Sequence, residues 1–305
     1  MRVLITGAGG FCGRHLTAYL EGQGVDVHSL GTRELRRPGH HRIAHTGDRE
    51  ALVAVVGEVC PDAVFHLAGV RVAAEVGEFY RVNTEYAVVL LEALALAGFV
   101  QRPVLMLGTA AEYGLIRAED LPLREELRPQ PYDHYGISKL AQTLEALAAH
   151  RRTGAAVVVV RAFNLIGPGM PAHLALQSFA LQLARIRRGT AEPVIETGNL
   201  RSVRDFVGID EAVSVLWDIA RTPRAVGHVV NLCSGKGTAV SDLLAEMIAI
   251  SGLSVTVKTV AERTQAIDIP VHYGSPEKLV SFVGRRPGTE LQGTLRAILE
   301  AAWKS

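Results

Sequence analysis

Short, continuous runs of apolar residues alternate along the chain with longer segments in which apolar residues recur at helical spacing. We predict strands at residues 3–6, 25–30, 63–67, 104–107 and 156–161. The segments between them predict helices, and the strongest helical periodicity covers 81–98 and 135–150. Because continuously apolar strands must be covered on both faces, the alternation predicts a doubly wound α/β fold around a parallel sheet.

The pattern changes after Gly167, where a Pro-Gly-Met-Pro sequence breaks the chain and a helix at about 175–188 follows without an immediate strand. The apolar run at 227–232 predicts a further strand of the main sheet. The expected division is a main domain at 1–166 with a return segment at about 204–232, and a smaller C-terminal α/β lobe at 167–203 and 233–305.

Three glycines, Gly7, Gly10 and Gly13, lie between the first predicted strand and the helix that begins near Phe11. Without side chains, the turn can tighten and a pyrophosphate can approach the amides at the positive end of the helix. In this position the pattern favours a dinucleotide-binding, Rossmann-type sheet over a merely tight turn. Phe11 and Cys12 complete the expected contacts, with Cys12 as a small packing residue and not a reactive thiol.

The second predicted strand does not end in the acidic residue that an NAD site normally places there to bind the ribose hydroxyls. It runs instead into Arg33, with Arg36 and Arg37 close behind. A guanidinium pairs with a 2′-phosphate through charge-assisted hydrogen bonds, so the sequence favours NADP(H), with NAD(H) as the alternative. If these arginines only form a solvated loop, the preference disappears.

Two further places are expected to contact the cofactor. Asp48 either caps the helix that follows it or faces the adenine ring, with Arg49 beside it. Leu67, Ala68 and Gly69 end a strand at the carboxyl edge of the sheet, where ligands bind in such folds. The glycine is expected to lie under the cofactor.

Tyr135 and Lys139 are four residues apart on a predicted helix, so the phenol and the ammonium project from one face. The nearby cation is expected to lower the pKa of the tyrosine from its ordinary value of about 10. Tyr135 can then exchange a proton with an oxygen while hydride moves at the adjacent carbon. Thr109, at the end of the fourth predicted strand, is expected to hydrogen-bond that oxygen.

Together these motifs resemble the extended short-chain dehydrogenase/reductase family, also called the NAD-dependent epimerase/dehydratase family. The resemblance covers nearly the whole chain and is carried by residues 6–13, 109–114, 135–139, 161–164 and 204–206. Within the family, residues 108–114, 164–169 and 198–207 are most similar to reductases of GDP-4-keto-6-deoxymannose and to GDP-mannose 4,6-dehydratases.

The resemblance implies catalytic roles for Thr109, Tyr135 and Lys139, with the lysine also holding the nicotinamide ribose. It implies that Asn164 contacts a sugar nucleotide and that Arg204 approaches its nucleotide or phosphates. The simpler alternatives are a turn-capping side chain for Asn164 and an ion pair with the adjacent Asp205 for Arg204.

The departures from the family pattern limit which of the family's reactions we expect of this chain. Dehydratases of the family place acidic residues directly after the catalytic threonine, where this chain has Ala110 and Ala111, both expected to line the substrate site. Dehydration is therefore not expected, and Glu112 is expected to point to the other side of the strand end. Gln265 replaces an arginine of the reductases, which weakens the assignment of a GDP-sugar unless Arg263 substitutes for it.

Composition excludes several other classes of protein. A formal charge of +1 over 305 residues provides no field for binding nucleic acid or an anionic membrane, and we expect neither as a partner. Three dispersed cysteines fit a reducing cytoplasm, and the spacing of the 11 histidines predicts no metal site. The longest apolar stretch is too short to cross a bilayer, and the N-terminus reads as a strand and not as a signal.

The leading hypothesis is NADP(H)-dependent reduction of a 4-keto sugar nucleotide in the cytoplasm, with Tyr135 as proton donor. The alternatives are a sugar-nucleotide 4-epimerase that retains NAD, a ketoreductase of a non-nucleotide natural-product intermediate, and a non-catalytic cofactor-sensing protein. The joint presence of Thr109, Tyr135 and Lys139 argues against the sensor, which needs no proton donor. The two long helices resemble those of the family's dimer interface, so a homodimer is expected.

Overall fold

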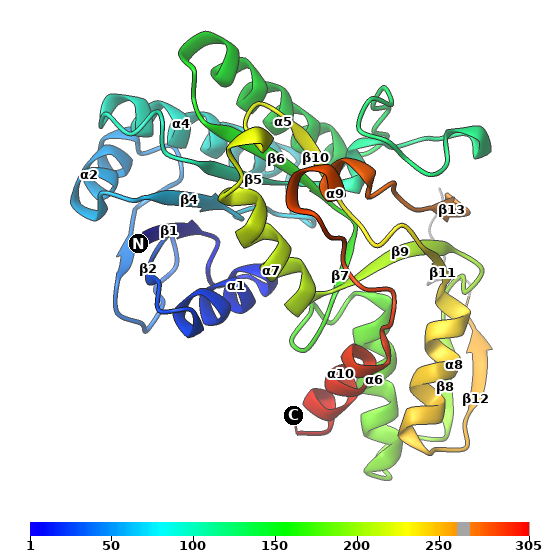
Figure 1. Cartoon of the computed structure of the whole chain (residues 1–305). Helices are drawn as coiled ribbons and strands as arrows, with labels where there is room; N and C mark the ends of the chain where they lie inside the picture. The colour runs from blue at the N-terminus through cyan, green and yellow to red at the C-terminus, as the bar shows by residue number, and fades with distance from the viewer. Residues whose placement is uncertain (261–268, 305) are drawn as a thin grey trace.

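The computed structural model describes residues 1–260 and 269–304. Its largest element is a sheet of seven parallel strands in the order β10-β6-β5-β4-β1-β2-β3 (Figure 1). The strands are β1 (Arg2–Thr6), β2 (Asp26–Gly31), β3 (His40–Arg42), β4 (Ala63–His66), β5 (Val104–Thr109), β6 (Val157–Ala162) and β10 (Val229–Leu232). The apolar pattern predicts six of these strands. It misses β3, a short polar strand that pairs only at the edge of the sheet.

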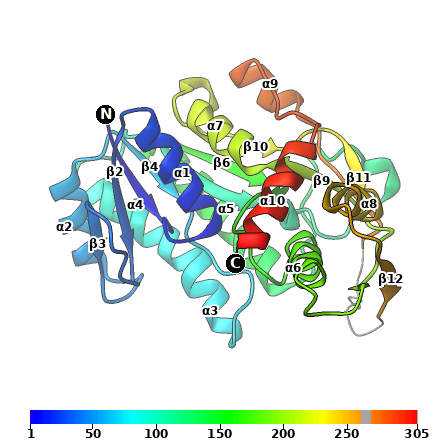
Figure 2. The same ribbon diagram turned by 90° about the horizontal axis from the view of Figure 1, so that it is seen from below.

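Helices cover both faces of this sheet, as Figure 2 shows for α1 and α7 on one side and α4 on the other. Their bounds are α1 (Phe11–Gly22), α2 (Arg49–Val59), α4 (Tyr86–Leu96), α5 (His134–Thr153), α7 (Ile209–Ala220) and α9 (Glu277–Val283). One apolar core lies between the sheet and α1, α7 and α9, and a second lies between the sheet and α2, α4 and α5. The predicted doubly wound parallel α/β fold is confirmed.

The two long predicted helices differ in how they form. The segment 81–98 consists of a π-helical turn (Arg81–Glu85) followed by α4, and the short helix α3 (Val76–Tyr80) precedes it. In contrast, α5 is continuous. Its first turn is capped by Asp133, whose carboxylate accepts the backbone N–H of Gly136 at 2.7 Å, and it ends at Gly154 with φ of 71°.

A smaller lobe forms beside the carboxyl edge of the sheet, with its own core of helices packed on short strands (Figure 1). Its helices are α6 (Ala175–Arg187), α8 (Val240–Ser251) and α10 (Gln292–Lys304). Its strands are β7 (Asn164–Ile166), β9 (Val203–Gly208), β11 (Gly237–Ala239) and β13 (Val271–His272) in one sheet, and β8 (Val194–Thr197) and β12 (Thr256–Thr259) in another. Short 3-10 turns lie at Ala110–Glu112, Ala118–Asp120 and Pro223–Ala225.

The chain passes between the two parts more than once. Strand β9 belongs to the sheet of the lobe, and the chain rejoins the main sheet through α7 and β10. Helix α9 then packs against α7 and β10, so its buried Leu279 belongs to a core of the main sheet. The limits of the two domains in the sequence remain a prediction.

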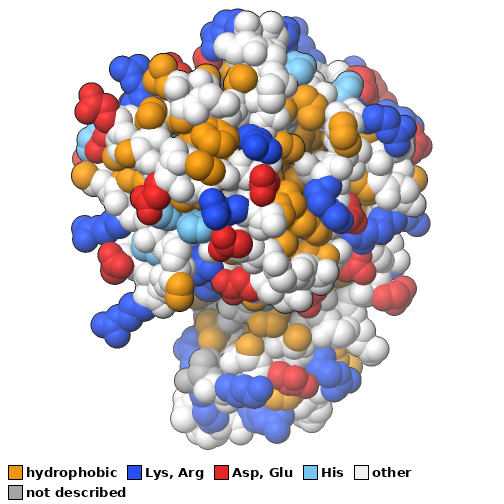
Figure 3. All heavy atoms as spheres, turned by 60° about the vertical axis from the view of Figure 1, so that its left-hand side comes forward, with side chains coloured by type: hydrophobic (Ala, Val, Ile, Leu, Met, Phe, Trp, Pro, Cys, Tyr) orange, Lys and Arg blue, Asp and Glu red, His pale blue; other side chains and the backbone are white. Residues whose placement is uncertain are grey.

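The surface carries charges of both signs. Over the face in Figure 3, basic and acidic side chains are interspersed. Such a mixed distribution gives no extended field of one sign on that face. In the part of the chain that the structure describes, no helix combines the length and the apolar character needed to cross a bilayer.

Candidate active site

Three of the predicted site segments lie at one edge of the main sheet. The glycine loop follows β1, residues 67–69 follow β4, and Thr109 ends β5. The chain passes from β1 to β2 on one side of β1, and it later adds β4 on the opposite side of β1. In open parallel sheets, ligands bind outside the strand ends at such a point.

The glycine loop is shaped by close backbone contacts. Gly7 has φ of 75°, and a Cβ atom there would lie 2.6 Å from the backbone nitrogen of Ala68. A Cβ at Gly13 would collide with the carbonyl oxygen of Gly7. Gly10 donates its N–H to that same carbonyl at 2.9 Å and begins α1 without a side-chain cap. This uncapped, tightly packed helix N-terminus fits the pyrophosphate of a dinucleotide.

Two side chains of the loop contact the protein interior. Phe11 packs against both the core beneath α1 and the core of the lobe. Burial raises the pKa of the Cys12 thiol to about 12, which agrees with its interpretation as a packing residue.

Arg14 and His15 tie the first turn of α1 to the turn that leads into the lobe. The guanidinium of Arg14 donates to the carbonyl oxygens of Gly9 at 2.8 Å and Gly169 at 3.1 Å. The imidazole of His15 lies 2.9 Å from the carbonyl oxygen of Pro168. The contacts with Gly169 and Pro168 have no local signal in the sequence, because these partners are more than 150 residues away along the chain.

The three arginines after β2 are not equivalent. Arg33 and Arg36 are exposed. Arg37 turns back onto α1, where it pairs with Glu21 at 2.5 Å and donates to the carbonyl oxygen of Val27. The structure therefore leaves Arg33 and Arg36 as candidates for a 2′-phosphate and gives Arg37 a structural role.

Asp48 acts as a helix cap in this structure. Its carboxylate accepts the N–H of Ala51 at 3.1 Å at the start of α2. Arg49 pairs with Glu92 of α4 at 3.5 Å. The bond from Asp48 to Ala51 corresponds to the capping alternative. Contact of Asp48 or Arg49 with the cofactor remains a prediction.

Gly69 lies next to the catalytic helix α5. A Cβ atom at Gly69 would be 3.2 Å from Oδ1 of Asn83 and 3.9 Å from Nζ of Lys139. The buried Asn83 side chain accepts the N–H of Val70 at 2.7 Å and donates to the carbonyl of Val70 and to Oγ of Ser138, both at 2.9 Å. Asn83 therefore fixes the loop after β4 against α5. Its only signal in the sequence is an amide within an apolar helical pattern.

The surroundings of Tyr135 correct one expectation. Burial raises the pKa of Tyr135 above its ordinary value, while a hydrogen bond with Thr109 and the charge of Arg71 act in the lowering direction. The guanidinium carbon of Arg71 lies 5.4 Å from the centroid of the tyrosine ring. The expectation that Lys139 lowers this pKa is wrong for this structure, and the cation over the ring is Arg71.

The ammonium of Lys139, one helical turn after Tyr135, is held by two hydrogen-bond acceptors. It donates to the carbonyl oxygen of Leu107 and to Oε1 of Gln142, each at 2.5 Å. Burial lowers its pKa to about 8. Gln142 also donates to Leu107 at 3.3 Å, so this residue, which the sequence analysis missed, orients the lysine.

Thr109 stands at the start of a 3-10 turn. Its hydroxyl oxygen accepts the N–H of Ala111 at 3.2 Å. Ala110 is buried and Ala111 is half-buried. Both side chains are methyl groups, which can neither donate nor accept a proton. Glu112 is buried and pairs with Arg161 at 2.8 Å.

Asn164 and Arg204 occupy neighbouring strands of the lobe, β7 and β9. The amide of Asn164 donates to the carbonyl oxygen of Asp205 at 2.8 Å. Arg204 donates to the carbonyl oxygens of Val203 at 2.9 Å and Pro270 at 3.4 Å. The Asp205 carboxylate accepts the backbone N–H groups of residues 234, 235 and 274 and the hydroxyl at 234. Gln265 and Arg263 lie outside the described residues.

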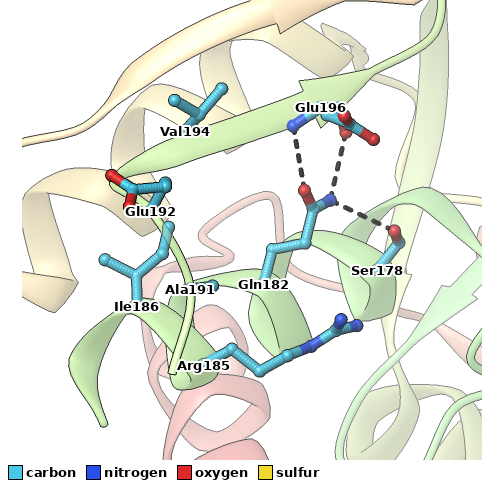
Figure 4. Close-up of a pocket in the computed structure, with 8 residues that line it drawn as sticks. All are labelled: Ser178, Gln182, Arg185, Ile186, Ala191, Glu192, Val194 and Glu196. Carbon is cyan, nitrogen blue, oxygen red and sulfur yellow. Dashed lines mark hydrogen bonds between the residues drawn. The ribbon is translucent and has the colours of Figure 1, made fainter. Parts of the chain in front are cut away.

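A separate hollow of about 280 Å³ lies between α6 and β8 (Figure 4). Gln182 covers the edge of β8 by accepting the N–H of Glu196 at 2.9 Å and donating to its carbonyl at 3.0 Å. The lining comprises Ser178, Gln182, Arg185, Ile186, Ala191, Glu192, Val194 and Glu196. It includes none of the residues predicted for catalysis or cofactor binding.

Metal ligation has no candidate within residues 1–260 and 269–304. No group of three or more His, Cys, Asp or Glu side chains there is arranged to hold an ion. The three cysteines, Cys12, Cys60 and Cys233, are unpaired.

Comparison with known proteins identifies relatives over the whole chain. Residues 3–233 match the NAD dependent epimerase/dehydratase family. The chain is 30% identical to GDP-6-deoxy-D-mannose reductase of Pseudomonas aeruginosa, over 100% of this chain and 97% of the relative. It is 27% identical to GDP-6-deoxy-D-talose 4-dehydrogenase of Aggregatibacter actinomycetemcomitans, over 100% and 98%.

The fold comparison agrees with the sequence relatives. The solved structure of RMD from Pseudomonas aeruginosa complexed with NADPH superimposes with a TM-score of 0.89, at 29% identity over 99% of both chains. The chain therefore belongs to the NAD-dependent epimerase/dehydratase family, the extended short-chain dehydrogenases/reductases, and is an NAD(P)-dependent oxidoreductase.

Proposed function

We propose that this enzyme reduces the 4-keto group of a sugar nucleotide with NADPH. The observation that carries the proposal is that Tyr135 and Lys139 lie one helical turn apart on α5, beside Thr109 at the end of β5 on the carboxyl edge of the sheet. The similarity to a GDP-6-deoxy-D-mannose reductase and to a GDP-6-deoxy-D-talose 4-dehydrogenase supports a GDP-linked deoxysugar as substrate.

The cofactor would be held by groups in the loops after β1 and β2 and on helix α5. The loop around Gly7, Gly10 and Gly13 would bind the pyrophosphate, because its amides open at a helix N-terminus. Lys139 would hold the nicotinamide ribose, and the exposed Arg33 would pair with a 2′-phosphate. When bound, NADPH supplies the hydride.

The proton would come from Tyr135. Its raised pKa keeps the phenol protonated at neutral pH, which suits a group that donates a proton to the oxygen of a ketone. Thr109 would orient that oxygen, while Asn164 and Arg204 would contact the sugar nucleotide from the lobe. Ala110 and Ala111 offer neither acid nor base, so water elimination is not part of the proposed reaction.

The direct test is reduction of GDP-4-keto-6-deoxymannose, followed by the loss of NADPH absorbance, with wild type and Tyr135→Phe. We expect the variant to bind NADPH normally and to turn over at least about a hundredfold more slowly, on the scale of general acid catalysis. Full activity of the variant would remove Tyr135 from the mechanism. Turnover without added cofactor, on a dinucleotide that co-purifies, would favour a 4-epimerase instead.

The same proposal includes a homodimer in the cytoplasm, formed through α4 and α5. Leu96 on α4 is 66% exposed and Leu144 on α5 is 55% exposed. Ile137, seven residues before Leu144, lies on the same helix face and is also exposed. Light scattering is expected to give a dimer for wild type and a monomer for Leu144→Asp, and a wild-type monomer would contradict the interface. The unpaired cysteines suit a reducing compartment.

A further inference from the structure

One buried carboxylate joins the two elements that carry the proposed catalytic groups, β5 and α5, to the neighbouring strand β6. Glu112 is 0% exposed. Its Oε1 accepts the backbone N–H of Thr109 at 2.9 Å, and its Oε2 accepts from Oγ of Thr143 at 2.9 Å and from Nε of Arg161 at 2.8 Å. These donors come from the end of β5, from α5 and from β6.

The surrounding residues are built to hold this group. A Cβ atom at Gly108 would lie 2.6 Å from Oε1 of Glu112, so only glycine leaves room for the carboxylate. Its partner Arg161 is itself 3% exposed and lies over the ring of Tyr113, with 4.7 Å between the guanidinium carbon and the ring centroid. A carboxylate buried this deeply is retained where a paired cation and hydrogen-bond donors satisfy it.

The bond to Thr143 connects the carboxylate with the catalytic helix. Thr143 lies one turn after Lys139 and two turns after Tyr135 on α5. Thr109, whose backbone N–H Glu112 accepts, lies close enough to Tyr135 to act on the pKa of its phenol. The bonds of Glu112 to Thr109 and Thr143 therefore tie the end of β5 to the helix that carries Tyr135.

We propose that Glu112 is the positioning residue that holds Thr109 against Tyr135 for proton transfer. The inference deepens the proposed function and rests on Tyr135 as the proton donor. Because one buried carboxylate bonds both the end of β5 and α5, it restrains the position of Thr109 relative to the helix that carries Tyr135. Small displacements of reacting groups can cost about a hundredfold in rate. The hydrogen bonds of Glu112 are therefore expected to affect turnover and not cofactor binding.

The charge of Glu112 acts in the same direction. The groups that influence Tyr135 are Thr109, Arg71, Glu112 and Asp133, and the two carboxylates raise its pKa. Glu112 also raises the pKa of Lys139 against the effect of burial. A negative charge at this position favours the protonated phenol, which is the form that donates.

The test is Glu112→Gln in the full-length enzyme, assayed with GDP-4-keto-6-deoxymannose and NADPH. The glutamine amide carries no charge, and its oxygen can still accept the N–H of Thr109. Its NH2 group, in the place of Oε2, cannot accept from Thr143 or from Arg161. We expect kcat to fall about ten- to a hundredfold, the KM for NADPH to stay unchanged, and the alkaline limb of the kcat–pH profile to move to lower pH.

The matched control is Glu125→Gln. Glu125 is half-buried and accepts a backbone N–H, from Asn231 at 2.7 Å, and Thr109 is not among its hydrogen-bond partners. This variant is expected to lose stability while its kcat and pH profile stay those of wild type. A pH profile that shifts equally in both variants would overturn the proposal, because it would report general loosening and not positioning.

Thr143→Val keeps the proposal testable if Glu112→Gln does not fold. This variant retains the pair of Glu112 with Arg161 and removes only the bond to α5, so we expect a smaller fall in kcat and again an unchanged KM for NADPH. Wild-type kcat in a folded Glu112→Gln or Thr143→Val protein would overturn the inference. Tyr135→Phe separates the two claims, since full activity there would defeat the proposed function itself.

Discussion

The glycine loop offers a prediction in which steric and backbone effects can be separated. Gly7 and Gly24 have nearly the same left-handed backbone, with φ of 75° and 73°. A Cβ atom at Gly7 would meet the nitrogen of Ala68 at 2.6 Å, whereas nothing lies within 4 Å of a Cβ at Gly24. Comparing Gly7→Ala with Gly24→Ala therefore isolates the contact with the loop after β4.

The expected loss of stability in each variant follows from two contributions, the cost of the left-handed backbone and the cost of overpacking. A left-handed backbone costs an alanine roughly 1–2 kcal/mol at either position. Overpacking against a backbone that must move adds about 1–3 kcal/mol at Gly7 alone. In a chain of this size, 1 kcal/mol corresponds to about 2 °C in Tm, so Gly7→Ala is expected to melt about 2–6 °C below Gly24→Ala.

The assay is thermal unfolding of both variants with and without NADPH. Ligand binding to the folded state raises Tm, and we expect this rise to be retained in Gly24→Ala and reduced in Gly7→Ala, because the displaced loop supports the pyrophosphate site. Equal melting temperatures for the two variants would refute the steric argument. An undiminished NADPH shift in Gly7→Ala would refute the placement of the cofactor on this loop.

Three further outcomes are expected. Arg33→Ala should raise the KM for NADPH about tenfold or more and leave that for NADH unchanged in steady-state assays; an equal change for both would exclude 2′-phosphate contact. Arg161→Met leaves Glu112 buried without its cation and should lower the free energy of unfolding in urea by about 3–5 kcal/mol, and a near-neutral result would contradict the buried pair. Burial lowers the pKa of His66 to about 3 and of His272 to about 4, so the unfolded chain takes up protons first as pH falls below about 6.5. Stability should therefore fall with pH between about 6.5 and 4 by about 1.4 kcal/mol per unit for each histidine, and urea titrations of His272→Phe should show a shallower slope than wild type.

Much of the fold could be predicted from local pattern. Strands buried on both faces must be continuously apolar, so the central strands are evident in the sequence, while β3, whose three residues are His-His-Arg, depends on pairing with β2 at the edge. The segment 81–98 shows helical periodicity, yet periodicity does not reveal the π-helical turn that places Asn83 beside Val70 and Ser138.

The sequence by itself determined which chemical groups the protein presents and in what local order: glycines at the start of a helix, and a phenol and an ammonium one helical turn apart. The tertiary structure decided how those groups behave. Burial raises the pKa of Tyr135, Lys139 is bonded to Leu107 and Gln142, and the cation that lies over the tyrosine ring is Arg71. Solvation and charge proximity depend on residues that are distant along the chain, and only folding brings them together.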